Sequence, residues 1–311
     1  MTEFNHQPVM LREVLAALDP KPGRWVLDGT LGGGAHAEAV LERNAPAGRL
    51  LGCDRDPDAL RASNARLARF KDRTDLRLGD FADVATWVPP ASCQAALLDL
   101  GVSSPQLDTP ARGFSFRDDG PLDMRLNPGA GRPAADWVNL ASADSLARIF
   151  RDLADEPDAR RIARAIERER QHHPFTSTRQ LADFIARTAP RRSSAIHPAT
   201  RCFQALRMAT NDELGSLLRG LPAVWHTLRP GGRLVVLTFH SGEDRIVKHF
   251  GQRLARNYDL DGPVDVPDFR RPRPPQLRWI GRKPQTPTTE ELTANPRARS
   301  AKLRVMEKLP L

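Results

Sequence analysis

Short apolar runs that end at or next to an acidic residue recur through the first hundred positions, and helical patterns separate them. Apolar residues at helical spacing cover Val9–Leu18, Ala35–Arg43 and Asp58–Phe70. This alternation predicts a parallel sheet whose strands are joined by right-handed helical crossovers. The predicted strands are Trp25–Asp28, Arg49–Asp54, Asp75–Leu78 and Cys93–Leu98.

The alternation stops after Asp99 and returns near position 206. Residues 109–127 have the composition of a loop, and four helical stretches follow, with Pro157 in a first helical turn and Ser177 as an N-cap. We expect residues 109–205 to form a helical insert in a sheet domain made of residues 1–108 and 206–311. The four stretches are Ala134–Leu140, Ser142–Leu153, Pro157–Gln171 and Thr178–Thr188.

The sheet pattern resumes in the last hundred residues. A helix over Asp212–Leu228 leads through a Pro-Gly-Gly turn at 229–232 to a strand over Arg233–Phe239 and a helix to about Asn257. Residues 258–287 are rich in proline and arginine and are predicted to be irregular. The alternation of Ala301–Lys308 predicts a closing antiparallel strand.

The turn after the first predicted strand has the glycines of a nucleotide-binding loop. The spacing Asp28-x-x-x-Gly32-x-Gly34 places backbone without Cβ atoms between a buried strand and a helix N-terminus, where a ligand can approach closely. Asp54 ends the next strand, at the position of a ribose-binding acid. An ordinary strand-to-helix turn and a surface aspartate remain the alternatives.

Acidic residues collect at the carboxyl edge of the predicted sheet. Four carboxylates would repel a pyrophosphate, but they suit the sulfonium, ammonium and ribose hydroxyls of S-adenosylmethionine (SAM). Phe81 offers a ring for an adenine. These features favour a methyltransferase over a dehydrogenase, and the expected fold is α/β, that of a class I SAM-dependent methyltransferase with a Rossmann-like seven-stranded sheet and an inserted helical domain. The acids are Asp28, Asp54, Asp80 and Asp99.

The charge of the chain indicates its kind of partner. The 311 residues carry a formal net charge of +9, and the pI is near 10.2, which favours a polyanion such as nucleic acid. A basic protein without such a partner stays an alternative. The three cysteines lack paired spacing for disulfides or zinc, and no apolar run resembles a signal peptide or membrane span, so we expect a cytoplasmic protein without a metal or a membrane partner.

Several motifs, in order along nearly the whole chain, resemble the bacterial ribosomal RNA small-subunit methyltransferase H family, also called MraW. The resemblance implies SAM-dependent methylation of the exocyclic N(4) amino group of a cytidine in the decoding centre of 16S rRNA, in the small ribosomal subunit. It leaves the oligomeric state open, with a homodimer as one option. The motifs are His6–Val14, Asp28–His36, Asp99–Asp108, Arg112–Phe116, His197–Arg207, Phe239–Lys248 and Asn295–Arg304.

The resemblance also implies which residues contact SAM, and the chain departs from the family pattern at two positions. Ala35 stands in place of a glycine and Gly242 in place of a leucine. An alanine is disfavoured where φ is positive, but we expect Ala35 to open a helix, where it is harmless. The implied SAM contacts are Gly34, Ala35, His36, Asp54, Phe81, Asp99 and Gln106.

Methylation of a cytosine amine requires alignment and hydrogen-bond acceptors, because the lone pair of that nitrogen is conjugated with the ring. The turn after Asp99 resembles in role the Asp-Pro-Pro-Tyr loop of amino-methyltransferases. Its candidate acceptors are Ser103, Ser104 and the backbone carbonyl that precedes Pro105. Asp99 either joins them or serves SAM. His240 either relays the released proton or caps the strand end.

Three further kinds of residue keep two interpretations each. His6 and His197 have the same alternatives as His240, and Phe114 or Phe116 either stacks on an extruded base or packs inside the insert. On the predicted helix Pro157–Gln171, arginines three and four residues apart share one face. This stripe either holds RNA phosphates or is an ordinary solvated face. Its members are Arg160 or Arg161, Arg164 and Arg168.

Three competing functions remain at this point. A DNA amino-methyltransferase would be expected to carry a sequence-reading domain, for which the insert is small. A small-molecule methyltransferase would not need a basic insert. A non-catalytic RNA-binding or ribosome-assembly protein would keep SAM as a structural ligand, and only an assay separates it from an enzyme.

Overall fold

The computed structural model describes residues 8–189 and 197–310, and these form two compact units. The sheet unit comprises the residues up to Gly101 and those from Gly215 onward, and the helical unit comprises Val102–Leu214. The expected insert, 109–205, lies entirely within the helical unit. His6, one of the histidines considered above, lies outside the described residues.

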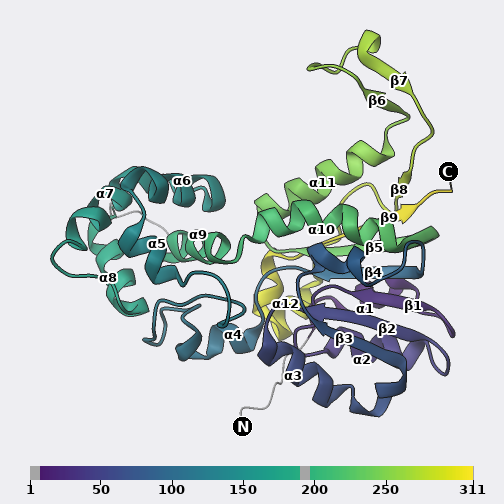
Figure 1. The fold of residues 1–311 in the computed structure, drawn as a ribbon, viewed down its shortest axis with the longest axis horizontal. Coiled ribbons are helices and arrows are strands. Elements are labelled where there is room, and N and C mark those ends of the chain that lie inside the picture. Colours follow the sequence, from purple (N-terminus) through teal and green to yellow (C-terminus); the bar gives the residue numbers. More distant parts are fainter. Residues whose placement is uncertain (1–7, 190–196, 311) are drawn as a thin grey trace. The chain divides into compact units, whose positions relative to one another are not determined.

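The sheet unit is built on a seven-stranded sheet with the strand order β3-β2-β1-β4-β5-β9-β8 (Figure 1). Strands β1 to β5 pair in parallel, whereas β9 is antiparallel to both β5 and β8. Because β1 pairs with both β2 and β4, the strand order reverses beside it, which is where ligands bind in open parallel sheets. The strands are β1 (Trp25–Asp28), β2 (Arg49–Asp54), β3 (Thr74–Leu78), β4 (Cys93–Asp99), β5 (Leu228–Thr238), β8 (Leu277–Trp279) and β9 (Lys302–Lys308).

Helices cover both faces of this sheet, and Figure 1 shows α10 and α11 on one side of it and α2 and α3 on the other. Leu27 and Leu98 face a buried cluster with α10, α11 and Phe81, whereas Val26 and Leu97 face a second cluster with α1 and α2. This alternation follows from the two-residue period of a strand. The helices are α1 (Leu11–Leu18), α2 (Ala35–Arg43), α3 (Pro57–Arg66), α10 (Glu213–Thr227), α11 (Ser241–Ala255) and α12 (Thr289–Ala294).

The predicted strands and helices of the first hundred residues are confirmed, with one exception. Helix α3 ends at Arg66, and Ala68–Arg73 is a separate 3-10 helix, so the expected single helix to Phe70 was wrong. A second 3-10 helix, Phe81–Thr86, replaces a full crossover helix between β3 and β4.

Two expectations for the last hundred residues were also wrong. The Pro-Gly-Gly turn is a bulge within β5, because Cys93 pairs with Leu228 while Ala95 pairs with Arg233, and Gly231 has a positive φ of 77°. The segment 258–287 is not wholly irregular, because β8 completes the main sheet and two short strands pair with each other. These are β6 (Tyr258–Leu260) and β7 (Arg270–Pro272), and two 3-10 helices, Pro267–Phe269 and Pro296–Ser300, complete this part of the chain.

The helical unit has its own core, which includes Phe150, Ile162 and Phe175. Ser177 caps α8 as predicted, by accepting from the backbone N–H of Gln180 at 3.3 Å. Pro157 lies in the turn before α7 and not in its first helical turn. Helix α9 was not predicted. The helices are α4 (Ser104–Asp108), α5 (Ala134–Leu140), α6 (Ala143–Ala154), α7 (Ala159–Glu169), α8 (Thr178–Thr188) and α9 (Thr200–Asn211), with a 3-10 turn at Pro110–Arg112.

All three cysteines, Cys53, Cys93 and Cys202, are buried and unpaired. Among residues 8–189 and 197–310, every helix is too short or too polar to span a lipid bilayer.

Candidate cofactor and active site

The glycine turn between β1 and α2 adopts backbone conformations that require glycine. Gly32 has φ of 51° and Gly34 has φ of 77°. A Cβ atom on Gly34 would lie 3.2 Å from Ser63 Oγ, which itself donates to the carbonyl of Gly32 at 2.8 Å. Ala35 is the first residue of α2 and its φ is not positive, so the expectation that Ala35 opens a helix is confirmed, and the backbone there does not require a glycine.

Asp54 connects the end of β2 to this turn. Its carboxylate accepts from the backbone N–H of Gly32 at 2.8 Å and from that of Asp56 at 2.8 Å. Two hydrogen bonds therefore hold the acid in place beside the glycines. Burial raises the pKa of Asp54 to about 6, because desolvation of the carboxylate outweighs these hydrogen bonds.

Asp28 ends β1 and is more deeply buried, with 2% of its surface exposed. It accepts from the backbone N–H of Thr30 at 3.0 Å. Burial is the largest cause that raises its pKa to about 7, and the negative charges of Asp99 and Asp54 act in the same direction. A positively charged ligand beside these acids would favour their ionised forms.

Asp99 ends β4, and Thr30 fixes its backbone by accepting from the Asp99 N–H at 2.7 Å. Its side chain lies 3.5 Å from Nε2 of the buried His36. Among the described residues, both ring nitrogens of His36 and Oδ1 of Asp99 are buried without a hydrogen-bond partner. Buried polar atoms are normally satisfied, so these three atoms indicate the place of a polar ligand. Together with the glycine turn and the acids, they fit the amino acid and ribose groups of SAM.

The carboxylate of Asp80 contacts a hydroxyl and a guanidinium in addition to the backbone. It accepts from the backbone N–H of Ala82 and from the hydroxyl of Ser216, and it lies 3.5 Å from Arg55. Phe81 is 8% exposed and packs against α10, where a Cβ atom on Gly220 would meet its ring at 2.3 Å. The predicted contact of Phe81 with adenine stays a prediction.

The Ser103–Gln106 segment of the helical unit begins α4 instead of forming the simple turn that we expected. The side chain of Gln106 accepts from the backbone N–H of Ser103 at 2.8 Å, and Ser103 reciprocates in a capping box. Ser104 is the first residue of α4 and Pro105 the second, so the pair is held rigidly at a helix N-terminus. The Ser-x-x-Gln spacing is the sequence signal that would have predicted this start.

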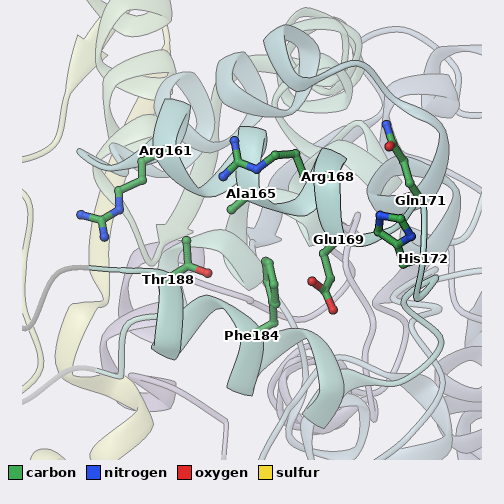
Figure 2. A pocket seen from close by; sticks show the side chains of 8 residues that line it. All are labelled: Arg161, Ala165, Arg168, Glu169, Gln171, His172, Phe184 and Thr188. Carbon is green, nitrogen blue, oxygen red and sulfur yellow. The ribbon is translucent and has the colours of Figure 1, made fainter.

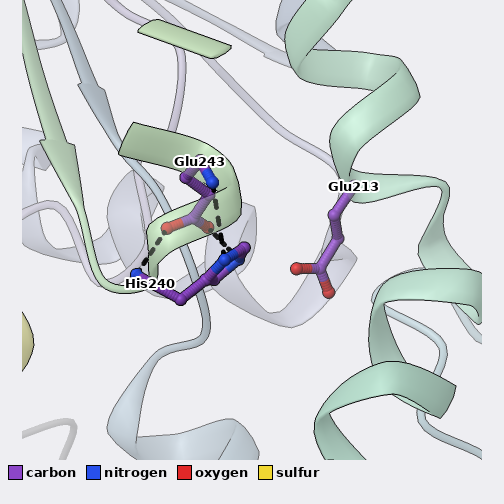
Figure 3. Close-up of side chains that lie close together, drawn as sticks. All are labelled: Glu213, His240 and Glu243. Atoms are coloured by element: carbon purple, nitrogen blue, oxygen red, sulfur yellow. Dashed lines mark hydrogen bonds and ion pairs between the residues drawn. The ribbon is translucent and has the colours of Figure 1, made fainter. Parts of the chain in front are cut away.

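His240 is the N-cap of α11, and Figure 3 shows its ring beside Glu243. Its Nδ1 accepts from the backbone N–H of Glu243 at 3.4 Å, while the Glu243 carboxylate accepts from the N–H groups of Phe239 at 2.7 Å and His240 at 3.3 Å. Of the two interpretations of His240, a structural cap and a proton relay, the structure shows the cap. Its relay role stays a prediction.

The aromatic candidates of the helical unit differ in exposure. Phe114 is 6% exposed and packs inside the protein. Phe116 is half-buried, and its ring centre lies 4.8 Å from those of His197 and Phe203. His197 Nδ1 also accepts from the backbone N–H of Ala199 at 3.2 Å. Of the two phenylalanines, Phe116 is the more accessible to a base.

Two residues that shape the site, Thr30 and Ser63, were not predicted from the sequence. Thr30 anchors the backbone of Asp99, and Ser63 supports the glycine turn from α3. Thr30 lies within the Asp28–His36 motif and Ser63 lies in no motif, but the sequence shows the role of neither, because each acts through a contact with a residue distant in sequence.

A glycine turn, buried acids and unsatisfied polar atoms at the carboxyl edge of a seven-stranded sheet with this strand order define a class I SAM-dependent methyltransferase. SAM is its cofactor. The chain belongs to the MraW methylase family, whose model matches residues 3–309.

Curated relatives match this chain over almost its whole length. The ribosomal RNA small subunit methyltransferase H of Pelobacter propionicus is 49% identical over 99% of this chain and 100% of that protein. The proteins of the same name from Trichlorobacter lovleyi and Magnetococcus marinus are 48% and 47% identical, and each alignment covers at least 98% of this chain and 99% of the relative.

Proposed function

We propose that this protein transfers a methyl group from SAM to the exocyclic N(4) amino group of a cytidine in the decoding centre of 16S rRNA. The observation that carries the proposal is the full-length match to relatives named ribosomal RNA small subunit methyltransferase H, the first at 49% identity. The substrate is then small-subunit rRNA, free or within the subunit. The net charge of +9 supports a polyanionic substrate.

The chemistry divides between cofactor binding and positioning of the amine. Bound SAM supplies a methyl group activated by a positively charged sulfur. Asp54 accepts from ribose hydroxyls, the glycine turn lets the backbone approach, and Asp28 and Asp99 offer carboxylates to the positive end of the cofactor. These residues orient and stabilise a charged ligand in a buried site, where electrostatic interactions are stronger than in water.

The amine is positioned by the beginning of α4. A serine hydroxyl at this end of the helix accepts a hydrogen bond from the target amine, whereas the carbonyl of Ser104, which precedes Pro105, belongs to the first turn of α4 and points along the helix axis. Gln106 keeps this segment rigid through its hydrogen bond to Ser103. Acceptors on the amino hydrogens draw the nitrogen lone pair out of conjugation, which makes the nitrogen a better nucleophile. Asp99 either adds a further acceptor for the amine or binds SAM. His240 is the candidate that carries the released proton away.

The helical unit supplies the RNA-binding surface in this proposal. Four arginines of α7 are exposed, and no hydrogen bond or ion pair of their side chains occurs among the described residues. Unpaired guanidinium groups on one helix can neutralise several phosphates. They are Arg160, Arg161, Arg164 and Arg168.

Transfer of radiolabelled methyl groups tests the proposal. Small ribosomal subunits from a strain that lacks the corresponding gene, subunits from the parent strain and duplex DNA are each incubated with the protein and labelled SAM. We expect label only in subunits from the deletion strain, because the parental subunits are already modified. Label in DNA would favour a DNA methyltransferase. SAM binding without transfer to any substrate would favour a non-catalytic assembly protein.

A further inference from the structure

A groove runs between α7 and α8 in the helical unit, with a volume of about 570 Å³. This lies within the range of roughly 300–1,000 Å³ that small-molecule sites occupy. Figure 2 shows Phe184 and Thr188 pointing from α8 toward α7, with Arg161 near one end and His172 near the other. The remaining lining residues are Ala165, Arg168, Glu169 and Gln171.

The two arginines of the groove differ from two other arginines of the helical unit, whose side chains bind within that unit. Elsewhere in the helical unit, Arg170 donates to the carbonyls of Val138 and Ala141, and Arg125 pairs with Asp123. Arg161 and Arg168 are exposed, and within the described residues neither side chain forms a hydrogen bond or an ion pair. Since arginine forks bind phosphate oxygens well, an anionic ligand would satisfy both.

Phe184 gives the groove an aromatic wall. The ring is half-buried, and it packs edge-to-face on the buried Phe175 at a centroid distance of 5.2 Å. The same side chain lines the groove, so part of it stays accessible. An unstacked base packs readily on such a surface, and this contact does not depend on base identity.

Polar groups at the other end of the groove match the edge of a base. Gln171 offers both a donor and an acceptor, and His172 is exposed. Glu169 is the only acid in the lining, and its carboxylate lies 3.3 Å from His173, so the two guanidinium groups dominate the charge. An acidic peptide would satisfy the arginines but would leave the aromatic wall and the amide without a specific use.

We propose that this groove binds one nucleotide of single-stranded RNA, separate from the cytidine that is methylated. Arg161 and Arg168 hold its phosphates, and its base lies against Phe184. No residue of the groove is among the candidate amine acceptors, so the groove is a second contact that holds the substrate strand. The inference rests on the proposed function, because it assumes an RNA substrate.

Binding of a fluorescent, mixed-sequence, single-stranded oligoribonucleotide to the full-length protein tests the groove. An oligomer with the same backbone but abasic sites serves as the second probe. The groove variant is Arg161→Gln with Arg168→Gln, and the matched control is Arg160→Gln with Arg164→Gln, which removes the same charge from the same helix outside the groove. Phe184→Leu removes the ring but keeps an apolar contact for Phe175.

The groove variant should bind the oligoribonucleotide at least tenfold more weakly, and its salt slope should flatten by about 1.4, since each lost phosphate contact contributes about 0.7. In the control, the salt slope should flatten by less than half of that amount. Phe184→Leu should weaken binding of the base-containing probe by about fivefold or more and leave the abasic probe unchanged. All variants should keep wild-type SAM affinity, which shows that they are folded.

Equal losses in the groove variant and the control would overturn the proposal in favour of a diffuse basic surface. Equal loss of both probes in Phe184→Leu would overturn base stacking, and competition by poly-glutamate as strong as that by RNA would overturn RNA as the ligand. Methyl transfer to small subunits by the wild type, measured separately, tells these outcomes from a failure of the proposed function itself.

Discussion

At the scale of single residues, the candidate cofactor site contains buried carboxyl groups that can ionise near neutral pH. Asp54 is held by two backbone N–H groups, and Asp28 by one. Burial nevertheless raises the pKa of both, to about 6 and about 7. Burial therefore favours the protonated forms of both acids, and a cationic ligand beside them would favour the ionised forms.

Replacement of Asp54 by alanine should weaken SAM binding at least tenfold. The variant loses hydrogen bonds from ribose hydroxyls to a charged acceptor, each worth about 1.5–3 kcal/mol. Calorimetric titration with SAM measures the change. Because Asp54 also supports the glycine turn, Asp54→Asn is the control that keeps the shape of the side chain. Unchanged affinity in both variants would remove Asp54 from the site.

SAM affinity should rise with pH between about pH 5 and pH 8, and Asp28 should account for most of the rise. Below its pKa of about 7 the acid is mostly protonated, so binding a cation requires release of a proton, at a cost of up to tenfold per pH unit. Titrations across this range should show the slope in the wild type and a flatter profile in Asp28→Asn. Equal slopes in the two proteins would refute this role.

The raised pKa of Asp28 also determines how the stability of the protein without SAM changes with pH. Unfolded Asp28 loses its proton near its ordinary pKa of 3.8, whereas the folded residue holds the proton until about pH 7. Its contribution to stability therefore falls as pH rises between these values. As pH rises over that interval, the thermal stability of Asp28→Asn should fall less than that of the wild type. An equal fall in the two proteins would contradict a raised pKa of the buried Asp28.

At the scale of elements, the beginning of α4 is the part of the site whose rigidity comes from sequence-local contacts. The capping box joins Ser103 and Gln106, which are three residues apart in the chain, at the beginning of the helix. Local signals of this kind are readable from sequence. Contacts such as that of Thr30 with Asp99, which join residues far apart in the chain, are not.

Ser103→Ala or Ser104→Ala should lower the single-turnover rate of methylation while SAM affinity stays near the wild-type value. Ser103→Ala also loses an N-cap worth about 1 kcal/mol, so Ser103→Thr, which keeps the cap, separates the two effects. Rapid-quench assays with small subunits measure the rate. Parallel losses of rate and SAM affinity would show that this segment only shapes the cofactor pocket.

Asn211, the last residue of α9, fixes the long loop before α5. It accepts from the backbone N–H of Leu126 and donates to the carbonyl of Met124, both at 2.8 Å. Asn211→Ala leaves buried loop groups unpaired, at about 1–3 kcal/mol each. Backbone amides of residues 113–133 should exchange hydrogen faster in this variant. Asn64→Ala, on the surface of α3, is the control, and equal exchange in both variants would contradict the role of Asn211.

At the scale of the whole molecule, the parallel half of the fold was predictable because apolar runs, glycines and acids repeat there with regular spacing. The antiparallel edge was less so. β8 has only three residues within a proline-rich segment, and it is identified as a strand by its pairing of Trp279 with Met306. α9 was missed because its apolar residues belong to a motif that we interpreted chemically. The roles of the site residues stay predictions, because each role depends on contacts with a substrate, and the spacing of residues along the chain does not specify those contacts.

The identity of the methylated nucleoside is the sharpest test of the proposed activity. Small subunits that have accepted labelled methyl groups are digested to nucleosides and separated beside authentic N(4)-methylcytidine, 5-methylcytidine and ribose-methylated standards. We expect the label to elute with N(4)-methylcytidine, because the acceptors proposed at the start of α4 are suited to an amine. Label in 5-methylcytidine or in a ribose-methylated nucleoside would contradict the proposed activity.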